Sequence, residues 1–212
     1  MTSIPHILIG AGGHAKVLIS LAKAVGVSVE GVCAPEFVGS RGNFWRGIEV
    51  LGGDDALERV DPERVLLIHG IGQLPSNFLR QRVHERLSSR GFRFATMVHP
   101  HSWVDETAQL EEGVQIMAGV VIQPDVTIGR ATIINTGASV DHDCQIGAHV
   151  HIAPGAVLCG NVTVQEGAFI ATGSTLLPGL TVARGAIVGA GATLVRDLAG
   201  QQCAIGPATR LK

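Results

Sequence analysis

The sequence contains no tyrosine, and aromatic residues make up only 4% of its 212 residues. It also has no basic run, and its formal net charge is −2 at pH 7. Nucleic acids and anionic membranes attract clustered Lys and Arg, so we exclude both as main partners. No apolar stretch reaches the roughly 18 residues of a membrane span, and the N-terminal segment lacks the basic region of a signal peptide. We therefore expect a cytoplasmic protein.

Cysteine is scarce, and Cys33, Cys144, Cys159 and Cys203 stand far apart. No pair has the close spacing of a structural zinc site, and this chain does not suggest a disulfide framework. We interpret the four residues as reduced thiols. Glycine is abundant instead, with 28 residues and no three-residue period, which indicates recurring tight turns.

A six-residue repeat runs through the second half of the chain. From Val104 to Leu194, every sixth residue is Val, Ile or Leu. Residues four positions after these aliphatics are mostly small, and residues three positions after them are mostly Gly, Asp or Asn, which tolerate positive φ. Short parallel strands joined by such corners form a triangular prism with about 18 residues per coil. A β-sandwich is the alternative, but its turns recur less regularly and at longer spacing.

The first hundred residues predict a small α/β domain with a parallel sheet. Strands are expected at 4–10, 27–33 and 65–69, and helices at 17–24 and 77–91, the second with Phe78, Leu79, Val83 and Leu87 on one side. A glycine-rich loop joins the first strand to the first helix. Backbone N–H groups of such a loop and the following helix N-terminus approach phosphates closely, so a nucleotide is the expected ligand.

Gly10, Gly12 and Ala15 also satisfy the fingerprint of dinucleotide-binding folds. That fingerprint requires an acidic residue at the end of the second strand, where this chain has Cys33-Ala34-Pro35. The domain is also only half the length of a full dinucleotide fold. We therefore favour another nucleotide ligand over NAD.

The strict hexapeptide pattern resembles the left-handed parallel β-helix of the hexapeptide-repeat acyltransferases, and the handedness comes from this resemblance. With Gly10-Ala11-Gly12-Gly13-His14-Ala15-Lys16 and Val140-Asp141-His142-Asp143-Cys144, the whole chain resembles the nucleotide-sugar acetyltransferases of the PglD and NeuD type. The resemblance implies a nucleotide-sugar-binding α/β domain at 1–98. It also implies a β-helix acetyltransferase domain with a C-terminal tail at 99–212, acetyl-CoA as co-substrate, and a homotrimer with active sites between subunits.

His142 is the candidate general base. It lies two residues after Val140, at an outward-facing position of the predicted prism. Acetyl transfer from a thioester to an amine requires a proton acceptor, and imidazole serves this role at neutral pH. Asp143 is placed to orient the ring and stabilise its protonated form. The resemblance implies the same catalytic pair.

His151 follows nine residues after His142, half a coil on, and therefore belongs to the next face of the prism. We expect His142 of one subunit and His151 of the next to line one site. The resemblance implies that His151, Gly160, Thr172 and Ala190 contact acetyl-CoA.

The other histidines have structural interpretations. His149 fills a glycine-type corner, and His99 and His101 precede the prism. A zinc carbonic anhydrase on a similar prism needs three suitably placed histidines, which are missing, so we expect no metal.

For the sugar nucleotide, the resemblance implies a diphosphate site at Gly12, Gly13 and His14, completed by segments near Ala34 and Gly72. Asn135 matches a family asparagine near the amino sugar, although a turn role explains it nearly as well. The family often has Asp-Asp in place of Ala34-Pro35, and Gly-Asn-Asn in place of Gly72-Gln73-Leu74. These departures leave UDP, GDP and dTDP open as the nucleotide.

The expected function is N-acetylation of a nucleotide-linked amino sugar, such as a 4-amino-4,6-dideoxy sugar, for surface glycan biosynthesis. A sialic acid or other sugar O-acetyltransferase shares the fold, the histidine base and acetyl-CoA. A non-catalytic trimeric assembly protein is the second alternative, although the intact His142-Asp143 pair argues against it.

Overall fold

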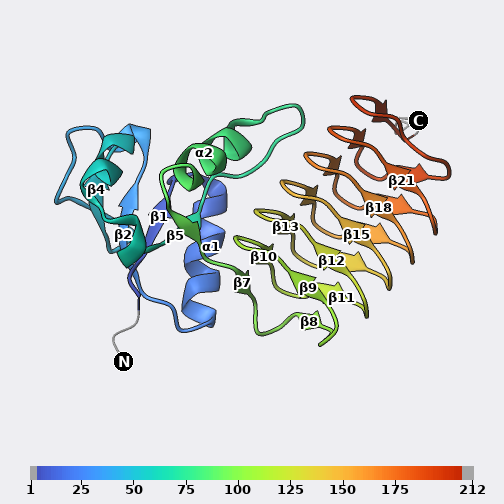
Figure 1. Ribbon diagram of the computed structural model, residues 1–212, viewed down its shortest axis with the longest axis horizontal. Coiled ribbons are helices and arrows are strands. Elements are labelled where there is room, and N and C mark those ends of the chain that lie inside the picture. The colour runs from blue at the N-terminus through green and yellow to red at the C-terminus, as the bar shows by residue number, and fades with distance from the viewer. Residues whose placement is uncertain (1–3, 207–212) are drawn as a thin grey trace, which may run out of the picture. The chain divides into compact units, whose positions relative to one another are not determined.

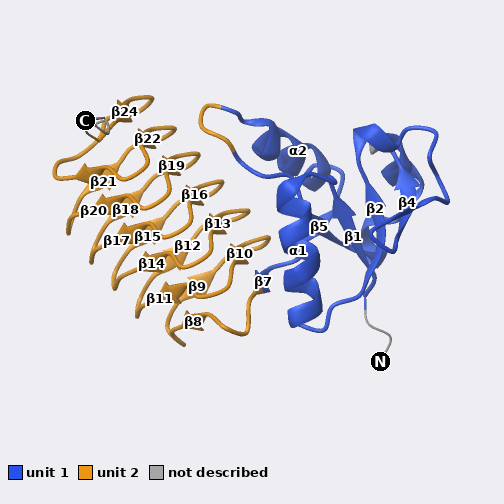
Figure 2. Ribbon diagram, turned by 180° about the vertical axis from the view of Figure 1, so that it is seen from behind, with its two compact units in different colours: residues 1–73, 77–97 blue, residues 74–76, 98–212 orange. Residues whose placement is uncertain are grey.

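The computed structural model describes residues 4–206, and the expected tail beyond Gly206 lies outside them. Two compact units divide the chain (Figure 2). The first holds the chain up to Gln73 together with Asn77–Met97, and the second holds Leu74–Ser76 and the chain from Val98 onward. Across the described residues, no helix is long and apolar enough to cross a membrane. All four cysteines are free thiols.

The first unit is built on a six-stranded sheet with the order β3-β4-β2-β1-β5-β6. Its strands are β1 (His6–Ile9), β2 (Val29–Cys33), β3 (Phe44–Trp45), β4 (Ile48–Gly52), β5 (Leu66–His69) and β6 (Arg93–Phe94). Its helices are α1 (Gly13–Ala24) and α2 (Leu79–Ser88), with 3₁₀ turns η1 (Pro35–Phe37), η2 (Asp54–Arg59) and η3 (Pro62–Arg64). All strand pairs are parallel except β3 with β4.

The parallel sheet is confirmed, and the hairpin of β3 and β4 adds one antiparallel pair at its edge. Arg46 and Gly47 join the two strands, and both have positive φ, at 52° and 79°. A two-residue turn with both central residues at positive φ matches the twist of a hairpin. This hairpin turn was hard to predict from the sequence because arginine rarely has a positive φ.

The buried side of α2 also differs from the expectation. Phe78 precedes the helix and Leu79 begins it, and both are exposed. The buried residues are Arg80, Val83, His84 and Leu87, which keep the helical spacing of one face. Arg80 tolerates burial because its Nη1 donates to the backbone oxygens of His69 and Ile71, at 2.8 and 2.5 Å.

The second unit is a prism of three parallel sheets, visible in Figure 1 as stacked coils. The first face contains β7 (Met97–Val98), β10 (Gln115–Ile116), β13 (Ile133–Ile134), β16 (His151–Ile152), β19 (Phe169–Ile170), β22 (Ile187–Val188) and β24 (Cys203–Ala204). The second face contains β8 (Trp103–Val104), β11 (Val121–Ile122), β14 (Ser139–Val140), β17 (Val157–Leu158), β20 (Thr175–Leu176) and β23 (Thr193–Leu194). The third contains β9 (Gln109–Leu110), β12 (Thr127–Ile128), β15 (Gln145–Ile146), β18 (Thr163–Val164) and β21 (Thr181–Val182).

The strand register confirms the predicted coil length. Val121 pairs with Ser139, and Ser139 pairs with Val157, so each coil advances the chain by eighteen residues. The row of aliphatic residues is buried along the axis from Ile116 to Leu194, whereas Val104 and Leu110 in the first coil are only half-buried. The corner residues have positive φ as predicted, including the non-glycine residues Asp125, Asp143, His149 and Asn161.

The repeat ends after β23. Ile187 pairs with Cys203, only sixteen residues on, and an isolated bridge joins Val182 to Leu198 with the same spacing. The last coil is therefore shorter by two residues than the regular coils before it.

Candidate active site

His142 occupies the corner between β14 and β15. Asp143 has a φ of 60°, and its backbone N–H donates to Pro124 O at 3.1 Å, one coil below. The carbonyl of His142 accepts from the backbone N–H of Asn161, one coil above, at 2.8 Å. Neighbouring coils thus fix the backbone of this corner from both sides, while the His142 side chain stays exposed.

Both flanking aspartates contact His142, Asp143 at the ring and Asp141 at the backbone. Nδ1 lies 2.7 Å from Asp143 Oδ2, and the backbone N–H of His142 donates to Asp141 Oδ1 at 2.9 Å. A carboxylate only accepts hydrogen bonds, so Nδ1 carries the proton and Nε2 of the neutral ring keeps its lone pair. The hydrogen bond to Asp143, and then the charge of Asp141, raise the pKa of His142 above its usual value. The exposed Nε2 can therefore accept a proton.

Gly160 lies directly against the His142 ring. A Cβ atom added at Gly160 would stand 2.7 Å from Cε1 and 2.8 Å from Nε2 of His142. Gly160 is buried and sits eighteen residues after His142, at the equivalent position of the next coil. Gly160, which the family resemblance predicts to contact acetyl-CoA, therefore also lies beside the imidazole of His142.

Cys144, next to the pair, is not a nucleophile candidate. Its side chain points into the prism, where Sγ donates to Cys159 O at 3.2 Å. Burial raises the pKa of the Cys144 thiol to about 11, so the thiolate is scarce at neutral pH. A buried thiol with a raised pKa is poorly suited to form a thioester, which leaves the His142 imidazole as the reactive candidate at this corner.

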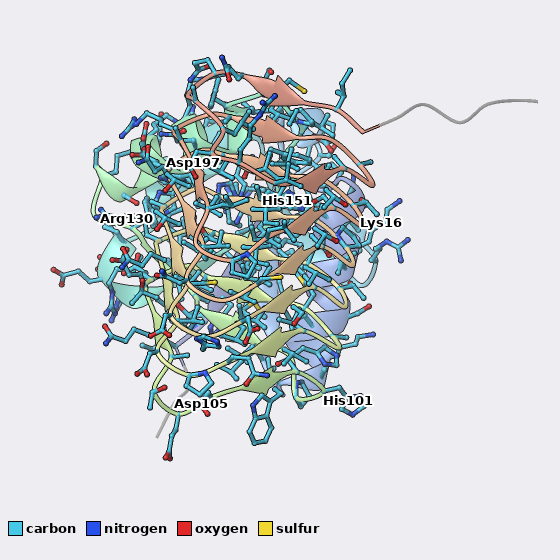
Figure 3. All side chains as sticks on the ribbon, turned by 90° about the vertical axis from the view of Figure 1, so that its right-hand side faces the viewer. Lys16, His101, Asp105, Arg130, His151 and Asp197 are labelled. Carbon is cyan, nitrogen blue, oxygen red and sulfur yellow. The ribbon has the colours of Figure 1, made fainter. Side chains whose placement is uncertain are left out.

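His151, labelled in Figure 3, lies on the first face in β16 and is buried. Its ring packs against Phe169 at a centroid distance of 4.9 Å, and its Nε2 lies 3.3 Å from Asn135 Nδ2. Asn135 follows β13, the neighbouring strand on this face. The structure thus brings Asn135 and His151 together, and it gives no contact between His142 and His151 among the described residues.

Thr172 and Ala190 share another corner, between the first and second faces. Both are exposed, and they occupy equivalent positions in successive coils. The backbone oxygen of Thr172 accepts from the N–H of Gly191 at 2.9 Å. Gly160 belongs to the corner between the second and third faces. The four residues predicted to contact acetyl-CoA therefore lie on separate parts of one prism.

In the first unit, the glycine loop follows β1 and leads into α1. Gly12 caps the helix with extended backbone, and a Cβ atom at Gly12 or Gly13 would meet nothing within 4 Å. Neither glycine is required by packing within the protein. The open space leaves the first N–H groups of α1 accessible to an anion.

The other predicted substrate residues lie at the carboxyl ends of neighbouring strands. A Cβ atom at Gly72 would stand 3.3 Å from Cβ of His14, so the loop after β5 lies against the first turn of α1. The N–H of Gly10 donates to Cys33 O at 2.7 Å, which joins the glycine loop to the end of β2. Ala34 follows β2 and is buried, so its side chain does not face a ligand. The carboxyl edge of a parallel sheet is the usual ligand position in such domains.

Arg80 is a residue that sequence reasoning missed. Its two hydrogen bonds to His69 and Ile71 hold the start of the loop that carries Gly72. The available signal was its helical spacing with Val83 and Leu87, which puts an arginine on the apolar side of α2. Within residues 4–206, no cluster of His, Cys, Asp or Glu is arranged to hold a metal ion.

Family comparisons match both units. The PglD N-terminal domain model matches residues 7–87, and the bacterial transferase hexapeptide (six repeats) model matches residues 107–142 and 125–160. The first match includes the glycine loop and Gly72, and the second includes His142 and His151.

Solved structures match nearly the whole chain. PerB from Caulobacter crescentus, in complex with CoA and GDP-perosamine, is 39% identical with a TM-score of 0.87, covering 95% of this chain and 94% of that one. A histidine-to-asparagine variant of perosamine N-acetyltransferase from the same organism, with the same ligands, is 38% identical with a TM-score of 0.87, covering 95% and 93%. The acetyltransferase domain of PglB from Neisseria gonorrhoeae, in complex with acetyl coenzyme A, is 32% identical with a TM-score of 0.83, covering 96% and 97%. On these matches, the chain belongs to the PglD-type hexapeptide-repeat acetyltransferases.

Proposed function

We propose that the protein transfers the acetyl group of acetyl-CoA to the amino group of a nucleotide-linked amino sugar, with His142 as the general base. One observation carries the assignment of the base. The Nδ1–H of His142 faces the Asp143 carboxylate at 2.7 Å, which leaves the Nε2 lone pair exposed at a fixed corner of the prism. Family membership supports the reaction, because the relatives bind CoA or acetyl coenzyme A.

The chemistry follows from this geometry. The sugar amine attacks the thioester carbonyl carbon, and Nε2 of His142 accepts the proton that the nitrogen loses as the new C–N bond forms. The C–S bond then breaks, and the imidazolium returns its proton to the departing CoA sulfur. Asp143 stabilises the imidazolium between these two transfers. The products are an N-acetylated sugar and CoA thiol, and the proton lost by the amine ends on the CoA sulfur.

We propose a GDP-linked 4-amino-4,6-dideoxy sugar as the first acceptor to test. Two relatives that are 38–39% identical are in complex with GDP-perosamine. The glycine loop supports a diphosphate ligand, because Gly12 and Gly13 leave open space before the N-terminus of α1. Gly72 and His14 adjoin this loop. The product then enters surface glycan biosynthesis.

We also propose that the enzyme works in the cytoplasm as a homotrimer whose active sites lie between subunits. The arrangement of one prism supports this. His142 and Gly160 lie on one corner, whereas Thr172 and Ala190 lie on another and His151 lies on a third surface. Packing a second prism against the first brings different faces together across one groove.

The experiment is an assay of CoA thiol release from acetyl-CoA with GDP-, UDP- and dTDP-linked 4-amino-4,6-dideoxy sugars. We expect rapid release with one of them, and a loss of about 10²- to 10⁴-fold in kcat for His142→Ala because the proton acceptor is gone. His101→Ala is the matched control, since His101 is another exposed histidine on the second unit.

Three outcomes contradict the proposal in different ways. Full activity in His142→Ala removes this residue as the base and leaves the reaction intact. Release with free sialic acid or another hydroxyl acceptor, and with none of the amino sugars, replaces N-acetylation by O-acetylation. Absence of acetyl-CoA binding favours the non-catalytic assembly role.

A further inference from the structure

The order of strands in the first unit marks two of its loops as ligand-binding loops. β1 lies inside the sheet, and the chain adds β2 and then the β3–β4 hairpin on one side of it before crossing to β5 on the other (Figure 1). In open parallel sheets, ligands bind beyond the carboxyl ends of the strands at the point where the strand order reverses. The loops at that point are the glycine loop, residues 10–12, and residues 70–72, here called the β5 loop.

The glycine loop and the β5 loop pack tightly against each other. A Cβ atom at Gly70 would stand 2.7 Å from Ile9 O and 3.0 Å from Cβ of Ala15, in the first turn of α1. A Cβ atom at Gly10 would stand 3.0 Å from Cγ1 of Ile71. Both glycines therefore allow a closer contact than a residue with a side chain permits. The position of the β5 loop consequently determines that of the glycine loop and of the N-terminus of α1.

Arg80, on α2, holds the β5 loop in this position. Its Nη1 donates to the backbone oxygens of His69, at the end of β5, and of Ile71, in the middle of the loop. Nε2 of His69 donates in return to Arg80 O at 2.9 Å. Only 1% of the Arg80 surface is exposed, so the side chain is not available to a ligand. Any effect of Arg80 on a ligand must therefore act through the loop.

We propose that Arg80 is a positioning residue for the nucleotide, and that it holds the β5 loop against the glycine loop so that the N-terminus of α1 keeps the geometry that receives a diphosphate. The contacts are those of the first unit alone, and only the identity of the ligand rests on the proposed function. Hydrogen bonds from a charged donor contribute more than neutral ones. Without them the loop occupies other positions for part of the time, and the apparent affinity falls with the fraction of competent molecules.

The closing experiment is isothermal titration calorimetry of the full chain with GDP, and with UDP and dTDP in parallel. Arg80→Met replaces the guanidinium by an apolar side chain of similar length that cannot donate. We expect its Kd for the nucleotide that the wild type binds most tightly to rise by about tenfold to a hundredfold, the worth of a hydrogen bond from a charged donor. The Kd for acetyl-CoA should stay unchanged.

Leu87→Ala is the matched control for a general loss of stability. Leu87 lies on the same buried face of α2, two turns beyond Arg80. Its truncation leaves a cavity and lowers the melting temperature, but it removes no bond to the β5 loop. We expect the nucleotide Kd of this variant to equal that of the wild type. Equal weakening in Leu87→Ala and Arg80→Met would assign the effect to stability and overturn the proposal.

A second variant keeps the test decisive if Arg80→Met does not fold. Arg80→Lys retains the charge but replaces the planar fork by a single ammonium group, so we expect it to fold and to bind the nucleotide at least about threefold more weakly. An unchanged Kd in either folded variant overturns the proposal, as does a wild type that binds none of the three nucleotides. If the nucleotide binds with the expected dependence on Arg80 but no acetyl transfer occurs, the proposed function fails while this inference stands.

Discussion

At the scale of single residues, Gly160 controls the space available to the proposed base. The added Cβ of Gly160→Ala would stand 2.7 Å from Cε1 of His142, which is closer than non-bonded atoms approach. The ring is the exposed end of a side chain, so it moves aside and the fold is retained. We expect a loss of about a hundredfold in kcat, the effect of misplacing a reacting group by about 1 Å, with an unchanged melting temperature.

A double-mutant cycle tests whether Gly160→Ala lowers kcat by displacing the His142 ring. If Gly160 acts through the ring, then Gly160→Ala causes no further loss in a His142→Ala background. An equal loss in both backgrounds would instead assign Gly160 to the cofactor, as the family resemblance implies. Steady-state kinetics of the four proteins make this measurement.

The proposed catalytic pair could be identified from the sequence, whereas the residues that surround it could not. His142 and Asp143 are neighbours in the chain, so their hydrogen bond needs only a corner that turns both outward. Gly160 lies eighteen residues away, and its contact with the ring depends on the register of two coils. The bond between Asn135 and His151 spans sixteen residues and depends on how two side chains leave neighbouring strands.

At the scale of elements, α2 carries titratable groups into the interior of the first unit. His69 on β5 and His84 on α2 are stacked at 6.2 Å, and His84 lies 4.5 Å from Phe94 on β6. Nε2 of His69 donates to Arg80 O at 2.9 Å. Burial, and then the charge of Arg80, hold the pKa of His69 well below its usual value, with smaller contributions from His84 and His14 in the same direction.

This cluster predicts that acid destabilises the first unit. His69 stays neutral when folded, but in the unfolded chain it takes up a proton below about pH 6.5. The unfolded state then binds more protons, so the stability that the neutral ring contributes is present above pH 6.5 and declines as the pH falls below it. One such proton lowers the free energy of unfolding by about 1.4 kcal/mol per pH unit.

Urea unfolding between pH 7.5 and 5.5 measures this effect. Trp103→Phe leaves Trp45 as the reporter of the first unit, because the sequence has two tryptophans. In that background, His69→Gln keeps a side-chain donor without a titrating ring and should flatten the pH dependence. If the free energy of unfolding depends equally on pH in the two proteins, His69 is ruled out as the source of that dependence.

The predicted second helix is confirmed as α2, with Val83 and Leu87 buried as expected, but the rest of its predicted buried face is wrong. Apolar residues alone selected a face containing Phe78 and Leu79, which are exposed in the structure. The real interior face includes Arg80 and His84, because the backbone oxygens of His69 and Ile71 offset the burial of the guanidinium. Hydropathy cannot anticipate such acceptors, since they are supplied by another segment of the chain.

At the scale of the whole molecule, the proposed trimer predicts complementation between inactive chains. His142→Ala and His151→Ala are each expected to be inactive. Mixed at equal amounts, they should recover activity, because about a quarter of the sites combine His142 from one chain with His151 from the next. Co-expression with two affinity tags, followed by the CoA release assay, measures the recovery.

The matched control uses two differently tagged copies of His142→Ala, which cannot restore any site. Activity no higher than this control would contradict a site shared between subunits, provided that both single variants are inactive and mixed trimers form. Purification over both tags establishes that the chains have mixed.

The sequence by itself determined the prism, its coil length and the nature of its corners. The reason is local: each hexapeptide repeats the same pattern of axis residue, left-handed corner and small residue, so one turn specifies all the others until the last coil shortens after β23. It also placed His142 beside Asp143. Only the tertiary structure decided which residues meet across coils and strands, such as Gly160 with His142 and Arg80 with the β5 carbonyls. These contacts depend on register and on backbone acceptors from distant segments, which no local pattern encodes.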